Sequence, residues 1–96
     1  AQPITAQRAY DMGFVNKVVP ADQLMPEALA FAQQIAGNAP LAVQYFKELA
    51  YRGLNMSTHD IAALTYHMYD DLLKTEDSKE GPKAFAEKRK PQWKGR

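Results

Sequence analysis

The sequence predicts a mainly α-helical fold, with about five helices and at most one short strand. Apolar residues recur at the three- and four-residue spacing of amphipathic helices, and capping residues, glycines and prolines divide that pattern into helix-length segments. Only one short run is rich in β-branched residues, and no second run could pair with it. With 96 residues, of which 46% are apolar, the chain makes one domain or part of a larger one.

The first part of the chain predicts a helix followed by an extended segment. Thr5 can cap a helix that runs to about Met12, and Gly13 is well placed to end it. The residues 14–19 include three valines and are closed by Pro20. This composition predicts a brief strand or an extended segment.

Two helices are predicted next, on either side of a Gly-Asn pair. Asp22 can cap a second helix that runs to about Ala36, and Gly37 with the following asparagine stops it. Pro40 is typical of the first residue of a third helix, because its missing N–H would have no helical partner there. Gly53 ends this third helix.

Two further helices complete the predicted fold. Ser57 or Thr58 caps a fourth helix, which runs to about Lys74. Thr75 or Asp77 opens a last helix, stopped before a proline near the C-terminus. A Gly-Pro pair near the start of this last helix argues against it, because proline is tolerated only in the first turn.

Composition excludes several classes of protein. The absence of cysteine excludes a disulfide scaffold, a thiolate zinc site, an iron–sulfur cluster and a cysteine nucleophile. No apolar run approaches the length of a membrane span, and the N-terminal residues lack both an initiator methionine and a signal-peptide pattern. We therefore expect a cytoplasmic protein without a membrane partner, processed or excised from something longer.

Charge is placed unevenly along the chain. Residues 1–78 carry five Lys or Arg against nine Asp or Glu, whereas residues 79–96 carry seven against two, so a basic tail lies within a near-neutral total of +1. Basic residues interleaved with aromatic ones can bind phosphate and stack on a base. A solvated basic end is the simpler interpretation, and the total charge predicts no nucleic-acid partner for the whole chain.

Candidate catalytic and metal-binding groups are few. His67 and Asp71 could share a metal ion, but no third ligand is apparent, so the sequence predicts no metal site. The pairs 70–71 and 76–77 are adjacent carboxylates, which do not face each other on a helix, and capping or surface solvation explains them better than catalysis. Aromatic residues on two helices predict either a helix–helix core or a subunit interface: Tyr45, Phe46, Tyr51, Tyr66 and Tyr69.

Two segments of the chain follow recognisable patterns. Residues 4–20 are similar to the stretch I-x-A-x-x-A-x-x-x-G-L-V-N-x-V-V-P, with Phe14 in place of the usual leucine. Residues 76–91 are similar to the C-terminal pattern E-D-x-x-E-G-x-x-A-F-x-E-K-R-x-P. Through these two segments the chain resembles the crotonase, or enoyl-CoA hydratase/isomerase, superfamily. The helix that begins at Pro40 follows the family order, so the resemblance covers nearly the whole chain.

The resemblance implies that these residues form the C-terminal helical domain of a longer enzyme. In that family a preceding β/α spiral domain supplies the oxyanion hole and usually the acid/base glutamates, and no residue here matches a catalytic position. The implied organisation is a single domain, 1–96, in which 1–20 would join the spiral core, 21–75 would form a helical oligomerisation region, and 76–96 would form the last helix and basic tail.

For the intact enzyme, the resemblance implies an acyl-CoA thioester substrate, no cofactor and a homo-oligomer of trimer type. Hydration of a 2-enoyl-CoA is the first expectation, with isomerase, hydrolase, dehalogenase and synthase chemistry left open. Phe85 and Lys88 fall where some hydratases contact the coenzyme A nucleotide, and their spacing of three would let them share a helix face.

The 96 residues alone are expected to self-associate and to lack activity. A free-standing helical binding module with a phosphate-binding tail, or a purely structural oligomerisation domain, would be the alternatives.

Overall fold

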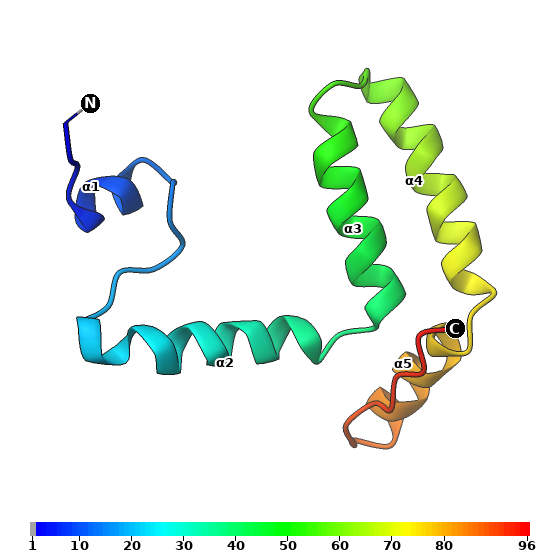
Figure 1. The fold of residues 1–96 in the computed structure, drawn as a ribbon. Coiled ribbons are helices and arrows are strands. Elements are labelled where there is room, and N and C mark those ends of the chain that lie inside the picture. The colour runs from blue at the N-terminus through cyan, green and yellow to red at the C-terminus, as the bar shows by residue number, and fades with distance from the viewer. Residues whose placement is uncertain (1) are drawn as a thin grey trace. The chain divides into compact units, whose positions relative to one another are not determined.

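The computed structural model describes residues 2–96 and confirms a mainly helical chain (Figure 1). The regular structure of these described residues consists of five α-helices and one 3-10 turn: α1 (Ala6–Asp11), η1 (Ala21–Gln23), α2 (Leu24–Ala36), α3 (Pro40–Gly53), α4 (Thr58–Leu73) and α5 (Asp77–Ala86). The described residues contain no strand, and the run 14–19 forms turns and irregular structure instead. The chain divides into two compact units, Ala1–Ala32 and Gln33–Arg96.

In the first unit, local sequence signals set the ends of α1 as predicted. The Thr5 hydroxyl accepts a hydrogen bond from the backbone N–H of Arg8 at 3.1 Å. At the other end Gly13 adopts a φ of +75°, and the N–H of Phe14 donates to the carbonyl of Ala9 at 2.8 Å. This left-handed cap satisfies a carbonyl that the helix would otherwise leave without a partner.

The predicted cap at Asp22 is wrong. A 3-10 turn precedes α2, with Pro20 in the capping position, so Asp22 lies inside the turn rather than before the helix. Its carboxylate accepts a hydrogen bond from the side-chain amide of Gln23 at 3.4 Å. Pro20 has an extended ψ of 150° and leads directly into the turn, which starts the helical conformation earlier than a cap at Asp22 would.

The second unit begins with the end of α2, where the Gly-Asn stop is confirmed. The N–H of Gly37 donates to the carbonyl of Gln33 at 2.9 Å. The side-chain amide of Asn38 then donates to two of the last carbonyls of the helix, those of Gln34 at 2.8 Å and Ile35 at 3.1 Å. Asn38 therefore caps this end with its side chain.

Helices α3 and α4 form an antiparallel hairpin (Figure 1). Pro40 is the first residue of α3, as predicted, and the Ser57 hydroxyl caps α4 by accepting from the N–H of Asp60 at 3.2 Å. Near the closed end of the hairpin, a Cβ added at Gly53 would collide with the Ile61 side chain. Gly53 therefore permits a close approach of the two helices as well as ending α3.

Helix α5 begins at Asp77, one of the two predicted starts, and the hydroxyl of Thr75, two residues earlier, accepts from the N–H of Ser78 at 3.1 Å. Pro82 lies inside the helix, beyond the first turn where it was expected to be tolerated. Residues 89–96, which we call the C-terminal strap, then run back beside α5 (Figure 1). The strap is held by the acidic first half of the helix.

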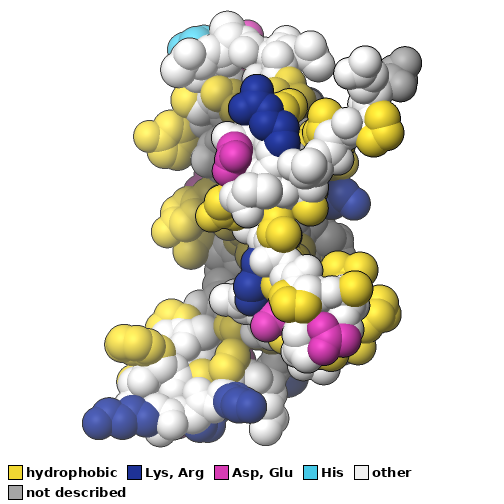
Figure 2. All heavy atoms as spheres, turned by 90° about the vertical axis from the view of Figure 1, so that its left-hand side faces the viewer, with side chains coloured by type: hydrophobic (Ala, Val, Ile, Leu, Met, Phe, Trp, Pro, Cys, Tyr) yellow, Lys and Arg dark blue, Asp and Glu magenta, His cyan; other side chains and the backbone are white. Residues whose placement is uncertain are grey.

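Few side chains are buried within this chain. Only three apolar residues are buried among those described: Ala9, Met68 and Ala84. Of the five aromatic side chains predicted to form a helix–helix core or a subunit interface, Tyr45 is half-buried and the others are exposed, with exposed fractions of 71% for Phe46, 68% for Tyr51 and 73% for Tyr66. Helices α3 and α4 pack on each other through one face, and α4 also contacts α5, so their remaining faces are not covered within the second unit. Hydrophobic side chains appear among charged ones on the surface that Figure 2 shows.

Candidate functional site

The end of α5 points a large aromatic side chain into solvent. Phe85 is 87% exposed, whereas its neighbour Ala84 is 1% exposed. Helix α5 therefore buries its alanine and turns the phenylalanine outward, so Phe85 is not a core residue within these described residues. An exposed phenylalanine of this kind offers an apolar face to a ligand or to another part of a protein.

Lys88 lies beyond the helix, which corrects the expectation that it shares a helix face with Phe85. Helix α5 ends at Ala86, and Lys88 has a φ of +53°. The N–H of Lys88 donates to the carbonyl of Phe85 at 3.2 Å, and the N–H of Arg89 donates to the carbonyl of Ala84 at 3.0 Å. These two bonds define a Schellman motif, in which Lys88 occupies the left-handed position that glycine usually fills.

Arg89 joins the turn after α5 to the body of the helix. Its Nη2 donates to Oε2 of Glu80 at 3.0 Å, its Nη1 donates to Oε1 of the same carboxylate, and its Nε donates to Glu87 at 2.6 Å. Glu80 also accepts the backbone N–H of Gln92 at 2.8 Å. The Arg89 hydrogen bonds, followed by that from Gln92, lower the pKa of Glu80 to about 2.

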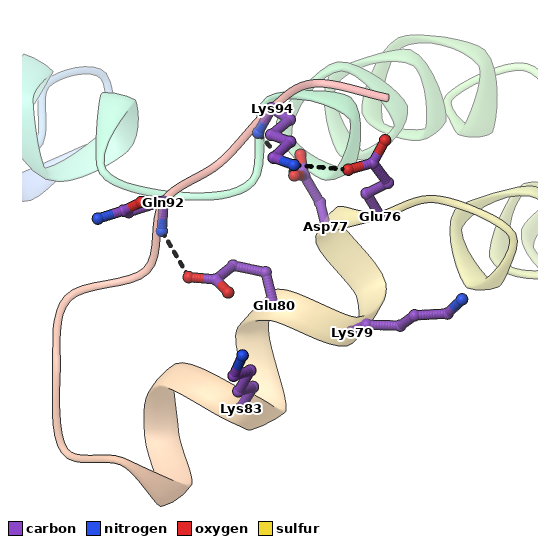
Figure 3. Close-up of a pocket in the computed structure, with 7 residues that line it drawn as sticks. All are labelled: Glu76, Asp77, Lys79, Glu80, Lys83, Gln92 and Lys94. Atoms are coloured by element: carbon purple, nitrogen blue, oxygen red, sulfur yellow. Dashed lines mark hydrogen bonds and ion pairs between the residues drawn. The ribbon is translucent and has the colours of Figure 1, made fainter.

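A buried carboxylate anchors the far end of the strap. Asp77 is 5% exposed and accepts the backbone N–H groups of Lys94 at 2.7 Å and Gly95 at 2.9 Å. The interpretation of this residue as surface solvation is wrong. The Nζ of Lys94 also donates to Glu76 at 2.9 Å (Figure 3), which lowers the pKa of the Glu76 carboxyl.

Trp93 extends the same attachment to the start of α3. Its indole Nε1 donates to the carbonyl of Gly37 at 2.7 Å, and its ring lies 3.4 Å from the position that a Cβ at Gly81 would take. The strap therefore fastens α5 to the loop between α2 and α3, and Gly81 leaves room for the indole.

A shallow cavity of about 250 Å³ lies between α5 and the strap. Seven residues line it, and Figure 3 shows Glu80 reaching from the helix toward Gln92: Glu76, Asp77, Lys79, Glu80, Lys83, Gln92 and Lys94. Its three carboxylates already accept hydrogen bonds from the strap. The cavity is therefore better explained as a gap between α5 and the strap bound to it than as a reaction site.

The same contacts pair three of the seven basic residues of the tail, residues 79–96, with carboxylates. Arg89 pairs with Glu80 and Glu87, while Lys94 and Arg96 pair with Glu76. A folded strap of this kind differs from the free basic tail that a nucleic-acid arm would need. Of the tail's basic residues, Lys79, Lys83, Lys88 and Lys90 form no ion pair with any residue in the range 2–96.

The remaining candidate groups do not assemble into a metal centre. The His67 Nε2 lies 3.7 Å from Asp71, but the same carboxylate accepts Lys74 Nζ at 2.9 Å, and this bond lowers the pKa of Asp71. Within the described part of the chain, no three His, Cys, Asp or Glu side chains are grouped to hold a metal ion. No helix between residues 2 and 96 has both the length and the apolar character needed to cross a membrane.

The sequence interpretation missed the network that holds the strap. Arg89 binds Glu80 nine positions away, and Asp77 accepts from the N–H groups of Lys94 and Gly95, up to eighteen positions away. Helical spacing does not reveal contacts over these sequence separations. The signal that could have found them is the pattern of residues 76–91, which contains Glu76, Asp77, Glu80 and Arg89 together.

The helical arrangement is that of the enoyl-CoA hydratase/isomerase fold. The chain is similar to an enoyl-CoA hydratase from Bacillus anthracis, at 38% identity and a TM-score of 0.93, over 97% of this chain and 36% of that one. It is also similar to an enoyl-CoA hydratase/isomerase from Mycobacterium paratuberculosis, at 40% identity and a TM-score of 0.89, over 97% of this chain and 37% of that one.

Sequence comparison agrees with the fold. The family model described as "Enoyl-CoA hydratase/isomerase" matches residues 1–96, and the chain therefore belongs to this family. Among curated relatives, a carnitinyl-CoA dehydratase from Proteus mirabilis is 43% identical over 97% of this chain and 37% of its own length. The chain thus spans a little over a third of the relatives that it matches.

Proposed function

We propose that these residues are the C-terminal part of a longer enzyme that acts on acyl-CoA thioesters, with hydration of a 2-enoyl-CoA as the first choice of reaction. The names of the similar proteins support this choice, because a hydratase and a dehydratase catalyse the addition and the removal of water. In this proposal residues 1–20 join the preceding domain, 21–75 contribute to oligomerisation, and 76–96 carry part of the nucleotide site.

The observation that carries the proposal is the pairing of an exposed aromatic ring with a cation at the end of α5. Phe85 is 87% exposed, and Lys88 follows in the turn with no ion-pair partner among residues 2–96. A phenyl ring can stack on adenine, and an ammonium can bind a phosphate. Both groups are therefore available to bind a nucleotide. The acidic first half of α5 is not available, because its carboxylates already accept hydrogen bonds from the strap.

Oligomerisation is supported by a second observation, the uncovered apolar faces of α3 and α4. Phe46, Tyr51 and Tyr66 are each more than two-thirds exposed. Exposed apolar surface on this scale is typical of a face that packs against another domain or subunit. A sedimentation equilibrium measurement should find the intact enzyme as an oligomer, and Phe46→Glu should lower its association, whereas Lys47→Glu should not.

The nucleotide role is tested by kinetics of the intact enzyme that carries these residues. Lys88→Ala removes one charge-assisted contact, so KM for crotonyl-CoA should rise about five- to thirty-fold while kcat is unchanged. Phe85→Ala should give the same pattern. Neither variant should alter KM for crotonyl-pantetheine, which lacks the nucleotide, and Lys79→Ala, an exposed lysine at the other end of α5, is the matched control. A large loss of kcat with unchanged KM would show that Lys88 acts in the chemistry instead.

A further inference from the structure

We propose that Arg89 is a positioning residue, which fixes the turn at Lys88 so that Lys88 and Phe85 face the nucleotide of the substrate together. This inference rests on the proposed nucleotide role of those two residues. The observation behind it is that the Arg89 side chain donates to Glu80, Glu87 and the carbonyl of Lys90, while Lys88 and Phe85 are left exposed.

The guanidinium of Arg89 forms a fork that no other basic residue of the tail matches among the described residues. It takes Glu80 through Nη1 and Nη2, Glu87 through Nε, and the carbonyl of Lys90 through Nη1 at 3.1 Å. These partners lie before and after Lys88 in the chain. A planar fork with several donors fixes direction as well as distance, which a single ammonium does not.

The turn itself requires such support. Lys88 is the only non-glycine residue with a positive φ among residues 2–96, whereas the corresponding position after α1 is Gly13. A left-handed conformation is unfavourable for a residue with a Cβ, and such residues persist where the surrounding structure holds them. The backbone N–H of Arg89 closes the turn on Ala84, and its side chain closes the turn on Glu80.

A lysine at this strained position provides a positive charge that a glycine would not. Glycine would relieve the backbone but would remove the ammonium. With Lys88 in the left-handed position, its side chain projects from the turn that follows Phe85. A helical residue could not occupy this position, because α5 has already ended at Ala86. Strained residues at ligand sites are held in this manner by their neighbours.

The alternative is that Arg89 only fastens the strap, with no effect on Lys88. That role would change stability and the fraction of folded enzyme, and it would affect every substrate equally. A positioning role predicts a change in KM that is confined to substrates carrying the nucleotide. The two roles therefore differ in a quantity that can be measured.

The experiment compares Arg89→Gln and Arg89→Lys in the intact enzyme. For Arg89→Gln, KM for crotonyl-CoA should rise about tenfold with kcat unchanged, and KM for crotonyl-pantetheine should not change. Arg89→Lys keeps the charge but loses the fork, so a smaller rise of the same kind is expected. The matched control is Lys94→Gln, which breaks a strap ion pair with Glu76 at the other end and should leave KM unchanged.

A coupling measurement shows whether Arg89 acts through its neighbours. In the Phe85→Ala, Lys88→Ala background, Arg89→Gln should raise KM no further. If Arg89→Gln does not fold, Glu87→Gln serves instead, because it removes only the Nε partner and should give a smaller rise in KM.

The two proposals fail in different ways. If Phe85→Ala and Lys88→Ala leave KM for crotonyl-CoA unchanged, the nucleotide role is refuted, and with it the positioning role. If those two variants raise KM but neither Arg89→Gln nor Glu87→Gln does, the positioning role alone is overturned. An equal loss of activity on both substrates, with a lower melting temperature, would also overturn it in favour of a purely structural clamp.

Discussion

Replacing Asp77 by asparagine should release the C-terminal strap. The carboxylate is buried at the first position of α5 and accepts two backbone N–H groups, from Lys94 at 2.7 Å and from Gly95 at 2.9 Å. A hydrogen bond to a charged group contributes about 1.5–3 kcal/mol, and a carboxylate at a helix N-terminus gains about 0.3–1 kcal/mol from the helix dipole. Asparagine keeps one acceptor oxygen without the charge, so we expect a loss of about 2 kcal/mol.

Hydrogen exchange of the two strap amides measures this loss directly. For local opening, about 2 kcal/mol corresponds to roughly thirtyfold faster exchange at Lys94 and Gly95 in Asp77→Asn. Asp70→Asn is the matched control, because it removes the same charge from an exposed position on α4. An acceleration below about threefold, or one equal to that of the control, would refute the assignment of Asp77 as the anchor of the strap.

Three further changes test other parts of the structure. Gly53→Ala should destabilise the α3–α4 hairpin by about 1 kcal/mol in urea unfolding, because the added Cβ meets the Ile61 side chain. Adding Ile61→Val should recover this loss of stability. An unchanged stability of Gly53→Ala would contradict the close approach of the two helices. Lys88→Gly should raise the free energy of unfolding by about 0.5–1 kcal/mol by removing the left-handed strain, while KM rises as for Lys88→Ala. With a pKa of about 2 in place of 4.5, Glu80 stabilises the fold fully above about pH 4.5, and this contribution is lost as pH falls through about 2; the fluorescence of the single Trp93 should follow it, and Glu80→Gln should remove it.

Features fixed by neighbouring residues could be predicted from the sequence. The caps at Thr5 and Ser57, the first turn at Pro40 and the left-handed end at Gly13 each depend on bonds spanning five residues or fewer. Asp22 shows the limit of such signals. An aspartate is also favourable inside the first turn of a helix, where Asp22 lies, because it interacts with the positive end of the helix dipole, and Pro20 takes the capping position instead.

Features that depend on distant residues could not be read from periodicity. Helical spacing identified apolar faces on α3 and α4 but not which of them would be covered, because burial depends on what packs against each face. The strap is set by pairs such as Glu80 with Arg89 and Asp77 with Gly95, which join the helix to a segment without regular structure. The turn at Lys88 was missed because a lysine gives no local sign of a left-handed conformation.

The central claim is that this segment supplies binding and assembly but not the chemical step. The direct measurement is the rate of crotonyl-CoA hydration by the purified 96-residue chain, with its helix content checked by circular dichroism. We predict no rate above that of an inactive control protein, because the candidate nucleotide contacts at Phe85 and Lys88 are exposed groups on one end of α5 and the carboxylates of the neighbouring cavity are occupied by the strap. A hydration rate well above the control, lost when Glu80 or Asp77 is substituted, would contradict the account.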